Sequence, residues 1–185
     1  MRVHDVLDPV PTTTAEALAA FDDAPQVDPD FMIGTWNGAE LPTSHPMDGM
    51  LAASGWWGKQ FIDAENVHPL LFPTSDGAAL WAMNPALAFG GLKAATGLPM
   101  LGRTSSYRRP IAALQPVLRT KAPKARLRIT RYRGIDSATM IYDQLPINDV
   151  FRQLSDDVVI GAMDMRGWIR PYFFVLRRDD SMPVR

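Results

Sequence analysis

The sequence predicts a mainly β protein, an antiparallel barrel with one or two short helices. Sixteen prolines and thirteen glycines are scattered along the 185 residues, which is typical of many short elements joined by turns. The last third alternates polar and apolar residues between turn signals, as strands do. A hydrophobic content of 46%, with five tryptophans, is enough for a sizeable core. Several short strands at this spacing favour a sandwich or a closed barrel.

The composition excludes several classes of protein and site. The chain has no cysteine, which removes disulfides, thiolate metal sites and cysteine nucleophiles. We find no signal peptide and no apolar run long enough to span a bilayer, so a cytoplasmic protein is expected. Residues 1–185 are expected to form a single domain. Its parts would be an N-terminal arm with a short helix (1–30), strands (31–83), an irregular crossover or lid (84–124) and a C-terminal meander (125–178).

Charge is nearly balanced, at −1, but it is unevenly distributed. Between Arg103 and Arg133 there are ten Lys or Arg and no acidic residue, while the first hundred residues are acidic. Such a run is found in nucleic-acid-binding proteins. The pI of about 6.3 gives no general attraction to a polyanion, so we expect no nucleic acid partner and expect the basic strands to lie beside the acidic half.

The first segments combine a helix with a glycine-flanked strand. Thr13 and Glu16 have capping-box spacing, which predicts a short helix that ends before Pro25. A strand is expected over residues 31–38, where two glycines flank Trp36, a side chain large enough to plug one end of a barrel. One or two helical turns are expected over residues 44–51, closed by Gly55.

The remaining strands follow from alternation and turn residues. The stretch 125–142 predicts a hairpin around a turn at residues 133–136, ending near Pro146. Residues 84–102, rich in glycine and alanine, predict no clear element. Further strands are expected at 56–61, 67–72, 78–83, 150–154, 158–164 and 172–177.

Taken together, the motifs resemble a known family. The chain is similar over nearly its whole length to the two-part GXWXG family, whose C-terminal portion is a domain of unknown function. That resemblance implies no particular reaction. The matching segments are GTWNG at 34–38, HPMDG at 45–49, GWWGK at 55–59, VHPL at 67–70, ARLR at 125–128, YRG at 132–134 and MIYDQLPINDVFR at 140–152.

The Gly34-x-Trp36 pattern near the first strand also resembles lipocalin and calycin barrels. In those barrels an arginine from the last strand packs over the tryptophan. The resemblance implies a calycin-like barrel in which Arg177 or Arg178 covers Trp36 by a cation–π contact.

Acid–base residues are the strongest candidates for chemistry. Asp143, after an expected strand and before a proline turn, is our first candidate for a base, followed by Asp149, His68 and His45. The candidate proton donors or oxyanion partners are Tyr142, Lys59 and His68. The alternative is that Asp143 and Asp149 only organise the loop between them. Candidate ligand-binding residues are His45, Trp57, Lys59, Arg128 and Arg131.

Cofactors are not expected. A metal site would have to combine His45, Asp48 and His68, a spacing that does not match a known metal motif. Some calycin barrels hold haem through a histidine late in the chain, but no histidine follows His68 here. No Walker, Rossmann or Gly-x-Ser-x-Gly pattern is present.

Two functions remain after these exclusions. The first is a cofactor-independent enzyme of the isomerase, cyclase or lyase type that moves protons on a hydrophobic small molecule. That molecule is either neutral or carries an anionic group. The second is a non-catalytic, lipocalin-like carrier of such a ligand. We favour the enzyme, because charged residues recur inside strand-like runs where desolvation is costly. A structural interaction module would have no cavity.

Overall fold

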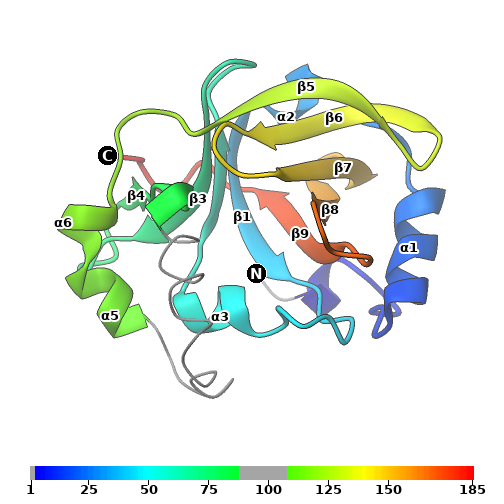
Figure 1. Ribbon diagram of the computed structural model, residues 1–185, viewed down its shortest axis with the longest axis horizontal. Helices are drawn as coiled ribbons and strands as arrows, with labels where there is room; N and C mark the ends of the chain where they lie inside the picture. The colour runs from blue at the N-terminus through cyan, green and yellow to red at the C-terminus, as the bar shows by residue number, and fades with distance from the viewer. Residues whose placement is uncertain (1–2, 88–107) are drawn as a thin grey trace.

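The computed structural model describes residues 3–87 and 108–185, and strands dominate it (Figure 1). The strands are β1 (Gly34–Glu40), β2 (Gly58–Phe61), β3 (Val67–Pro73), β4 (Leu80–Ala82), β5 (Ala125–Tyr132), β6 (Ile135–Tyr142), β7 (Ile147–Ser155), β8 (Val158–Met165) and β9 (Tyr172–Arg178). The helices are η1 (Val3–Asp5), α1 (Thr14–Asp23), α2 (Pro29–Met32), α3 (Met50–Ser54), α5 (Arg108–Ala113) and α6 (Gln115–Leu118).

Eight of the strands close into an antiparallel barrel, which confirms the predicted fold class. The hydrogen-bonded order is β2-β1-β9-β8-β7-β6-β5-β3-β4, and an additional β2–β3 pairing closes the ring. Strand β4 lies outside the ring as an extension of β3. Strand β1 runs beside β9 in the wall of the ring, and the long β5–β6 hairpin forms the wall at the top of the view (Figure 1).

The barrel interior is filled by large apolar side chains. Because side chains alternate across a strand, every second residue of the ring points inward. The inward-facing cluster joins residues from all parts of the chain, so folding of the core requires both halves. Its largest fully buried members include Trp36, Phe61, Phe151 and Tyr172.

Trp36 seals one end of the barrel, as the resemblance to calycins implied. Its ring is fully buried, and its Nε1 donates to the carbonyl of Met32 at 2.7 Å. The guanidinium carbon of Arg178 lies 4.4 Å from the Trp36 ring centroid. Arg178 also donates to the carbonyls of Ile33 and Phe31, both at 2.6 Å, so it ties α2 across the seal. The expectation of an arginine over Trp36 is therefore confirmed, with Arg178 in that position.

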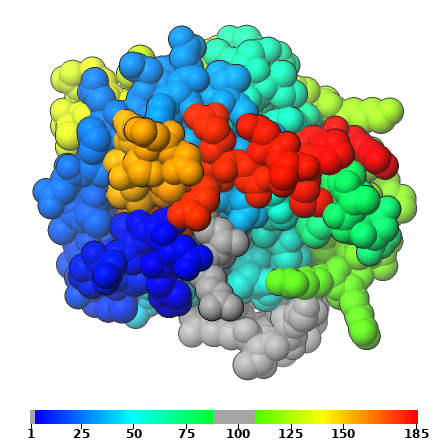
Figure 2. All heavy atoms as spheres, turned by 180° about the vertical axis from the view of Figure 1, so that it is seen from behind, coloured from blue at the N-terminus to red at the C-terminus, as the bar shows by residue number. Residues whose placement is uncertain are grey.

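Helix α1 packs on the outer wall formed by β7, β8 and β9. Phe21 lies in a second apolar cluster with Val150, Ile160 and Phe173. The guanidinium of Arg152, fully buried beneath the helix, lies 4.7 Å from the Phe21 ring centroid. Seen from behind, the N-terminal segment lies against this same side of the barrel, and the C-terminal tail runs beside β4 (Figure 2).

Most predicted elements are present, with three differences. The strand expected over residues 31–38 begins only at Gly34, because Pro29–Met32 form α2, a helix that was not expected. The capping box of Thr13 and Glu16 starts α1 as expected. The helical turns expected at 44–51 are displaced: the regular helix is α3, and residues 46–49 form turns before it. Within the stretch 84–124, residues 88–107 lie outside the described part, and the described remainder contains α5 and α6.

We predict that Trp36→Phe lowers the free energy of unfolding by about 1–3 kcal/mol, because it removes packed indole surface and a buried hydrogen bond. Urea denaturation followed by circular dichroism measures this change. Trp168→Phe is the control, because Trp168 is 37% exposed and its replacement should change stability by less than about 0.5 kcal/mol. Equal stability of Trp36→Phe and the native protein would show that the seal contributes nothing.

Candidate functional site

A buried ion pair crosses the barrel interior. The ammonium nitrogen of Lys59 lies 2.8 Å from Oδ2 of Asp149, with the two side chains 3% and 1% exposed. Lys59 belongs to β2 and Asp149 to β7, which stand four strands apart in either direction around the ring. The pair therefore joins opposite walls of the barrel.

Strand alternation places both charges inside. On β2, Lys59 shares its face with Phe61. On β7, Asp149 shares its face with Ile147 and Phe151. Phe61, Ile147 and Phe151 all belong to the interior cluster. The side chains of Lys59 and Asp149 therefore both point into the barrel, on the same face as these apolar neighbours. A charged residue on the apolar face of a strand is thus the sequence signal for this site.

Aromatic rings surround the ammonium group. The Nζ of Lys59 lies 5.0 Å from the ring centroid of Phe174, 5.5 Å from that of Trp56 and 5.8 Å from that of Tyr142. Each distance is within the range of a cation–π contact, and burial strengthens such contacts. The rings therefore replace part of the hydration that Lys59 loses on folding.

Two glycines make room for these rings. A Cβ on Gly38 would lie 2.1 Å from the Trp56 ring, and one on Gly161 would lie 2.4 Å from the Phe174 ring. Only glycine allows each ring to lie so close to the strand backbone. The second glycine of the GTWNG motif is therefore part of the site, since it seats a ring against Lys59.

Two buried polar atoms at the pair have no hydrogen-bond partner within residues 3–87 and 108–185. Lys59 donates a second hydrogen bond to the carbonyl of Pro69 at 3.2 Å. Oδ1 of Asp149 and Nε1 of Trp56 are buried without a hydrogen-bond partner in the described chain. Unpaired buried polar atoms cost stability, so each is available to bind a ligand or a water molecule.

Burial also raises the pKa values of Asp149 and Tyr142. Desolvation raises the pKa of Asp149 above its ordinary value, although the charge and hydrogen bond of Lys59 oppose this. The pKa of Tyr142 is raised well above its usual range by burial and by the negative charge of Asp149. Tyr142 therefore keeps its hydroxyl proton at neutral pH, and Asp149 is a stronger base than an exposed carboxylate.

His68 and Trp57 lie apart from the pair. The register pairs His68 with Gln60, whose side chain points to the face opposite that of its neighbour Lys59. His68 is buried there with Nδ1 unpartnered in the described chain, and burial lowers its pKa. Trp57 packs against Leu71, outside the interior cluster.

His45 lies at the barrel end opposite Trp36. Its ring centroid is 4.9 Å from that of Trp168 and 5.4 Å from that of Tyr172. Tyr172 donates to Oε2 of Glu40 at 2.7 Å, at the end of β1 away from Trp36. Nδ1 of His45 accepts from a backbone amide, and burial lowers the His45 pKa. These contacts place His45 in the rim of the barrel and not beside Lys59.

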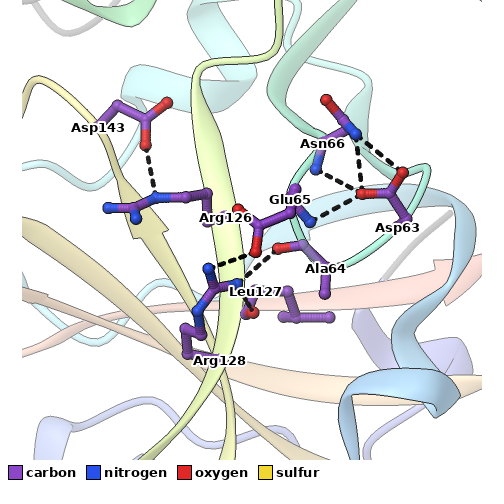
Figure 3. Close-up of polar contacts among 8 residues, drawn as sticks. All are labelled: Asp63, Ala64, Glu65, Asn66, Arg126, Leu127, Arg128 and Asp143. Carbon is purple, nitrogen blue, oxygen red and sulfur yellow. Dashed lines mark hydrogen bonds and ion pairs between the residues drawn. The ribbon is translucent and has the colours of Figure 1, made fainter.

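Asp143, our first candidate for the base, lies on the surface. It forms an ion pair with Arg126 at 3.1 Å, with exposed fractions of 37% and 48%, and points away from the interior (Figure 3). Neither Arg128 nor Arg131, both candidate ligand-binding residues, pairs with Asp143. Arg128 pairs with Glu65 (Figure 3), and Arg131 pairs with Asp136.

The structure gives acidic partners to four of the ten basic residues in the run from Arg103 to Arg133. Four arginines of the β5 strand and its turn each have an acidic partner, and two of those partners, Asp22 and Glu65, come from the acidic first half. Their charge is therefore largely neutralised within the fold, as the sequence suggested.

Other surface features of the described chain lie away from the ion pair. Two surface hollows, of about 500 and 170 Å³, lie around Asp28 and around Trp81, and neither is lined by Lys59 or Asp149. Within residues 3–87 and 108–185, no group of three or more His, Asp or Glu side chains is arranged to hold a metal ion. No helix in these same ranges has the length and apolar character needed to cross a bilayer.

The chain matches known proteins in two segments. Residues 19–77 match the family described as GXWXG protein, and residues 123–178 match a domain of unknown function, DUF4334. A crystal structure of a protein from Thermomonospora curvata is 34% identical, with a TM-score of 0.63, over 89% of this chain and 86% of that one. The chain belongs to the GXWXG–DUF4334 family. No curated protein matches it.

The two family segments each supply one half of the ion pair. Lys59 lies in the GXWXG segment and Asp149 in the DUF4334 segment. The GXWXG segment also contains Trp56, whereas Tyr142 and Phe174 belong to the DUF4334 segment. The candidate site is therefore assembled only when the two segments close one barrel.

We predict that Lys59→Met lowers the free energy of unfolding by about 3–5 kcal/mol at pH 8, because it leaves a buried carboxylate without its cation. The loss should be smaller at pH 5. Without Lys59, the folded-state pKa of Asp149 lies further above its unfolded value of about 3.9, so stability is lost as pH rises toward and through the folded pKa.

Urea denaturation of the native protein and the variant at several pH values measures this difference. The two buried histidines titrate in both proteins, so their contribution cancels. Lys121→Met, at an exposed lysine, is the matched control and should show little change at any pH. A loss for Lys59→Met that does not vary with pH would contradict the burial of an ionised Asp149.

Proposed function

We propose that the barrel binds a hydrophobic small molecule beside Lys59 and Asp149 and acts on it by acid–base proton transfer. Reactions of the isomerase, cyclase or lyase type fit this description. The observation that carries the proposal is an ion pair, 3% and 1% exposed, inside an otherwise apolar barrel. Perturbed ionisable groups of this kind are more frequent at functional sites than elsewhere.

A purely structural role explains the pair less well. Desolvation of two charges costs several kcal/mol per ion, and apolar side chains of similar volume usually stabilise a core as well or better. The pair also leaves Oδ1 of Asp149 unpartnered in the described chain, which adds to its cost. A ligand that bonds to this oxygen would offset that cost.

Each residue of the site has a role that follows from its surroundings. Asp149 is the base, because burial raises its pKa and its Oδ1 is available to accept a proton. Lys59 stabilises the negative charge that develops on the substrate when a proton leaves. Tyr142 retains its proton at neutral pH and serves as a hydrogen-bond donor. Trp56 and Phe174 contact the apolar part of the ligand.

The carrier remains the second candidate, and the size of the barrel favours it. Closed eight-stranded barrels are just wide enough to be filled by side chains or to hold one small ligand, as in lipocalins. A carrier would use the same aromatic residues but would need no proton transfer by Asp149.

We predict that Asp149→Asn abolishes turnover without abolishing ligand binding. The assay incubates the protein in D₂O with a panel of hydrophobic ketones, enones and hydroxy ketones and follows deuterium incorporation by NMR. Loss of the base should slow exchange by about 10²-fold or more, because general-base catalysis contributes about 10²- to 10⁴-fold. Binding is followed by displacement of the fluorescent dye anilinonaphthalene sulfonate.

Asp143→Asn is the matched control, because it removes an exposed carboxylate from the same part of the chain. It should keep full exchange activity. Loss of exchange in Asp143→Asn but not in Asp149→Asn would assign the base to Asp143 and overturn the proposal. Dye displacement without exchange in the native protein would identify a carrier.

A further inference from the structure

We propose that Lys59 forms a covalent iminium with an aldehyde or ketone group of the ligand, with Asp149 as its counterion. This inference rests on the proposed function, because the ligand must first reach the ion pair. It names the substrate class, a hydrophobic carbonyl compound, and it gives Lys59 the role of nucleophile.

The hydrogen bonds of Lys59 leave one position open for bond formation. An ammonium group has three N–H donors. One is directed to Oδ2 of Asp149 at 2.8 Å and one to the carbonyl of Pro69 at 3.2 Å. The third has no polar partner within the described residues, and three aromatic rings surround the group. After the proton passes to Asp149, rotation about the Cε–Nζ bond, with loss of the hydrogen bond to Pro69, turns the lone pair of Nζ toward a carbonyl carbon on the side of the rings.

The surroundings also favour a reactive amine. Burial in an apolar site is one of the two common ways in which proteins activate lysine for Schiff-base chemistry. Oδ2 of Asp149 lies 2.8 Å from Nζ and is placed to take the ammonium proton. That transfer exposes the lone pair of Nζ without moving any charge out of the site.

The reaction balances with these two residues alone. Asp149 accepts one proton from the Lys59 ammonium, and the neutral amine attacks the carbonyl carbon. One of its N–H protons then passes to the carbonyl oxygen, which gives a neutral carbinolamine. Asp149 returns its proton to the carbinolamine hydroxyl, which leaves as water as the C=N bond forms. One carbonyl compound and one ammonium group give one iminium and one water. The first proton transfer neutralises Lys59 and Asp149, and both charges return, on Nζ and on the carboxylate, when the C=N bond forms.

The charge of the site selects a neutral carbonyl over an anionic ligand. Asp149 already neutralises Lys59, and its free oxygen would repel a carboxylate or phosphate placed beside it. An iminium keeps one N–H for Oδ2 of Asp149 and keeps the cation that the rings of Trp56 and Phe174 stabilise. The site is therefore complementary to the product of the condensation.

Iminium formation would also make the proposed proton transfer easier. The positive nitrogen withdraws electrons from the adjacent carbon, so a proton on that carbon becomes more acidic than in the free carbonyl compound. Asp149, ionised again after water has left, is the base placed to remove it.

The test uses decanal as the probe and sodium cyanoborohydride to reduce the iminium to a stable amine. Intact-mass and peptide mass spectrometry then locate the decyl group. We expect Lys59 to be labelled about 10-fold or more faster than the exposed Lys121, and Asp149→Asn to slow labelling of Lys59 by about 10-fold or more. Lys59→Arg keeps a cation beside Asp149 and should lose the labelling at position 59, whereas Lys121→Arg should leave it unchanged.

Decan-1-ol, which cannot form an iminium, separates binding from bond formation. Displacement of anilinonaphthalene sulfonate by both decanal and decan-1-ol, with Lys59 labelled no faster than Lys121, would overturn the covalent inference and leave the proposed binding function intact. Failure of both compounds to displace the dye, together with an unlabelled Lys59, would overturn both. Labelling of Lys59 at the native rate in Asp149→Asn would overturn the assignment of Asp149 as the group that transfers the proton.

Discussion

The ion pair between Lys59 and Asp149 is the interaction on which the arrangement of the barrel interior depends. It joins β2 and β7 across the full width of the ring, and each partner has lost almost all contact with solvent. Neither charge could be buried alone, because an unpaired buried charge costs several kcal/mol. The two halves of the chain must therefore close around each other before either charge is satisfied. Rings from both halves then complete the surroundings of the ammonium group.

The GTWNG motif serves the seal and the site at once. Gly34 has φ +128°, and a Cβ there would lie 2.8 Å from the guanidinium of Arg178, so the first glycine lets that arginine cross over Trp36. Four residues after Gly34, Gly38 lets Trp56 lie against the strand and face Lys59. A single strand thus positions both the closed end of the barrel and one wall of the candidate site.

Much of the fold could be predicted from local sequence. The 125–142 hairpin followed from alternation and from its turn, where Arg133 and Gly134 both adopt positive φ. The pairings that close the ring could not be predicted, because β2–β3 and β3–β5 contacts depend on packing between distant segments. The displaced α3 also reflects tertiary context, since Glu40 on β1 accepts hydrogen bonds from the amides of Gly49 and Leu51.

The dependence on packing between distant segments also explains why the sequence favoured Asp143 over Asp149 as the base. Both follow the same strand in the sequence, and a position near a strand end suggested Asp143. The better indication was the alternation of Ile147, Asp149 and Phe151, which places the carboxylate on the apolar face of β7. Nothing in the sequence paired Asp149 with Lys59, because the two residues are 90 positions apart in the chain and come together only when the barrel closes.

The central claim is that the ion pair is retained to bind a ligand inside the barrel. The most direct measurement is solvent extraction and mass spectrometry of the purified native protein and of the double variant Lys59→Met/Asp149→Leu, which replaces both charges by apolar side chains and should remain folded. A hydrophobic carbonyl compound should be extracted from the native protein and be depleted from the variant. Equal recovery of the same compounds from both proteins, or a native interior that yields none, would contradict the claim.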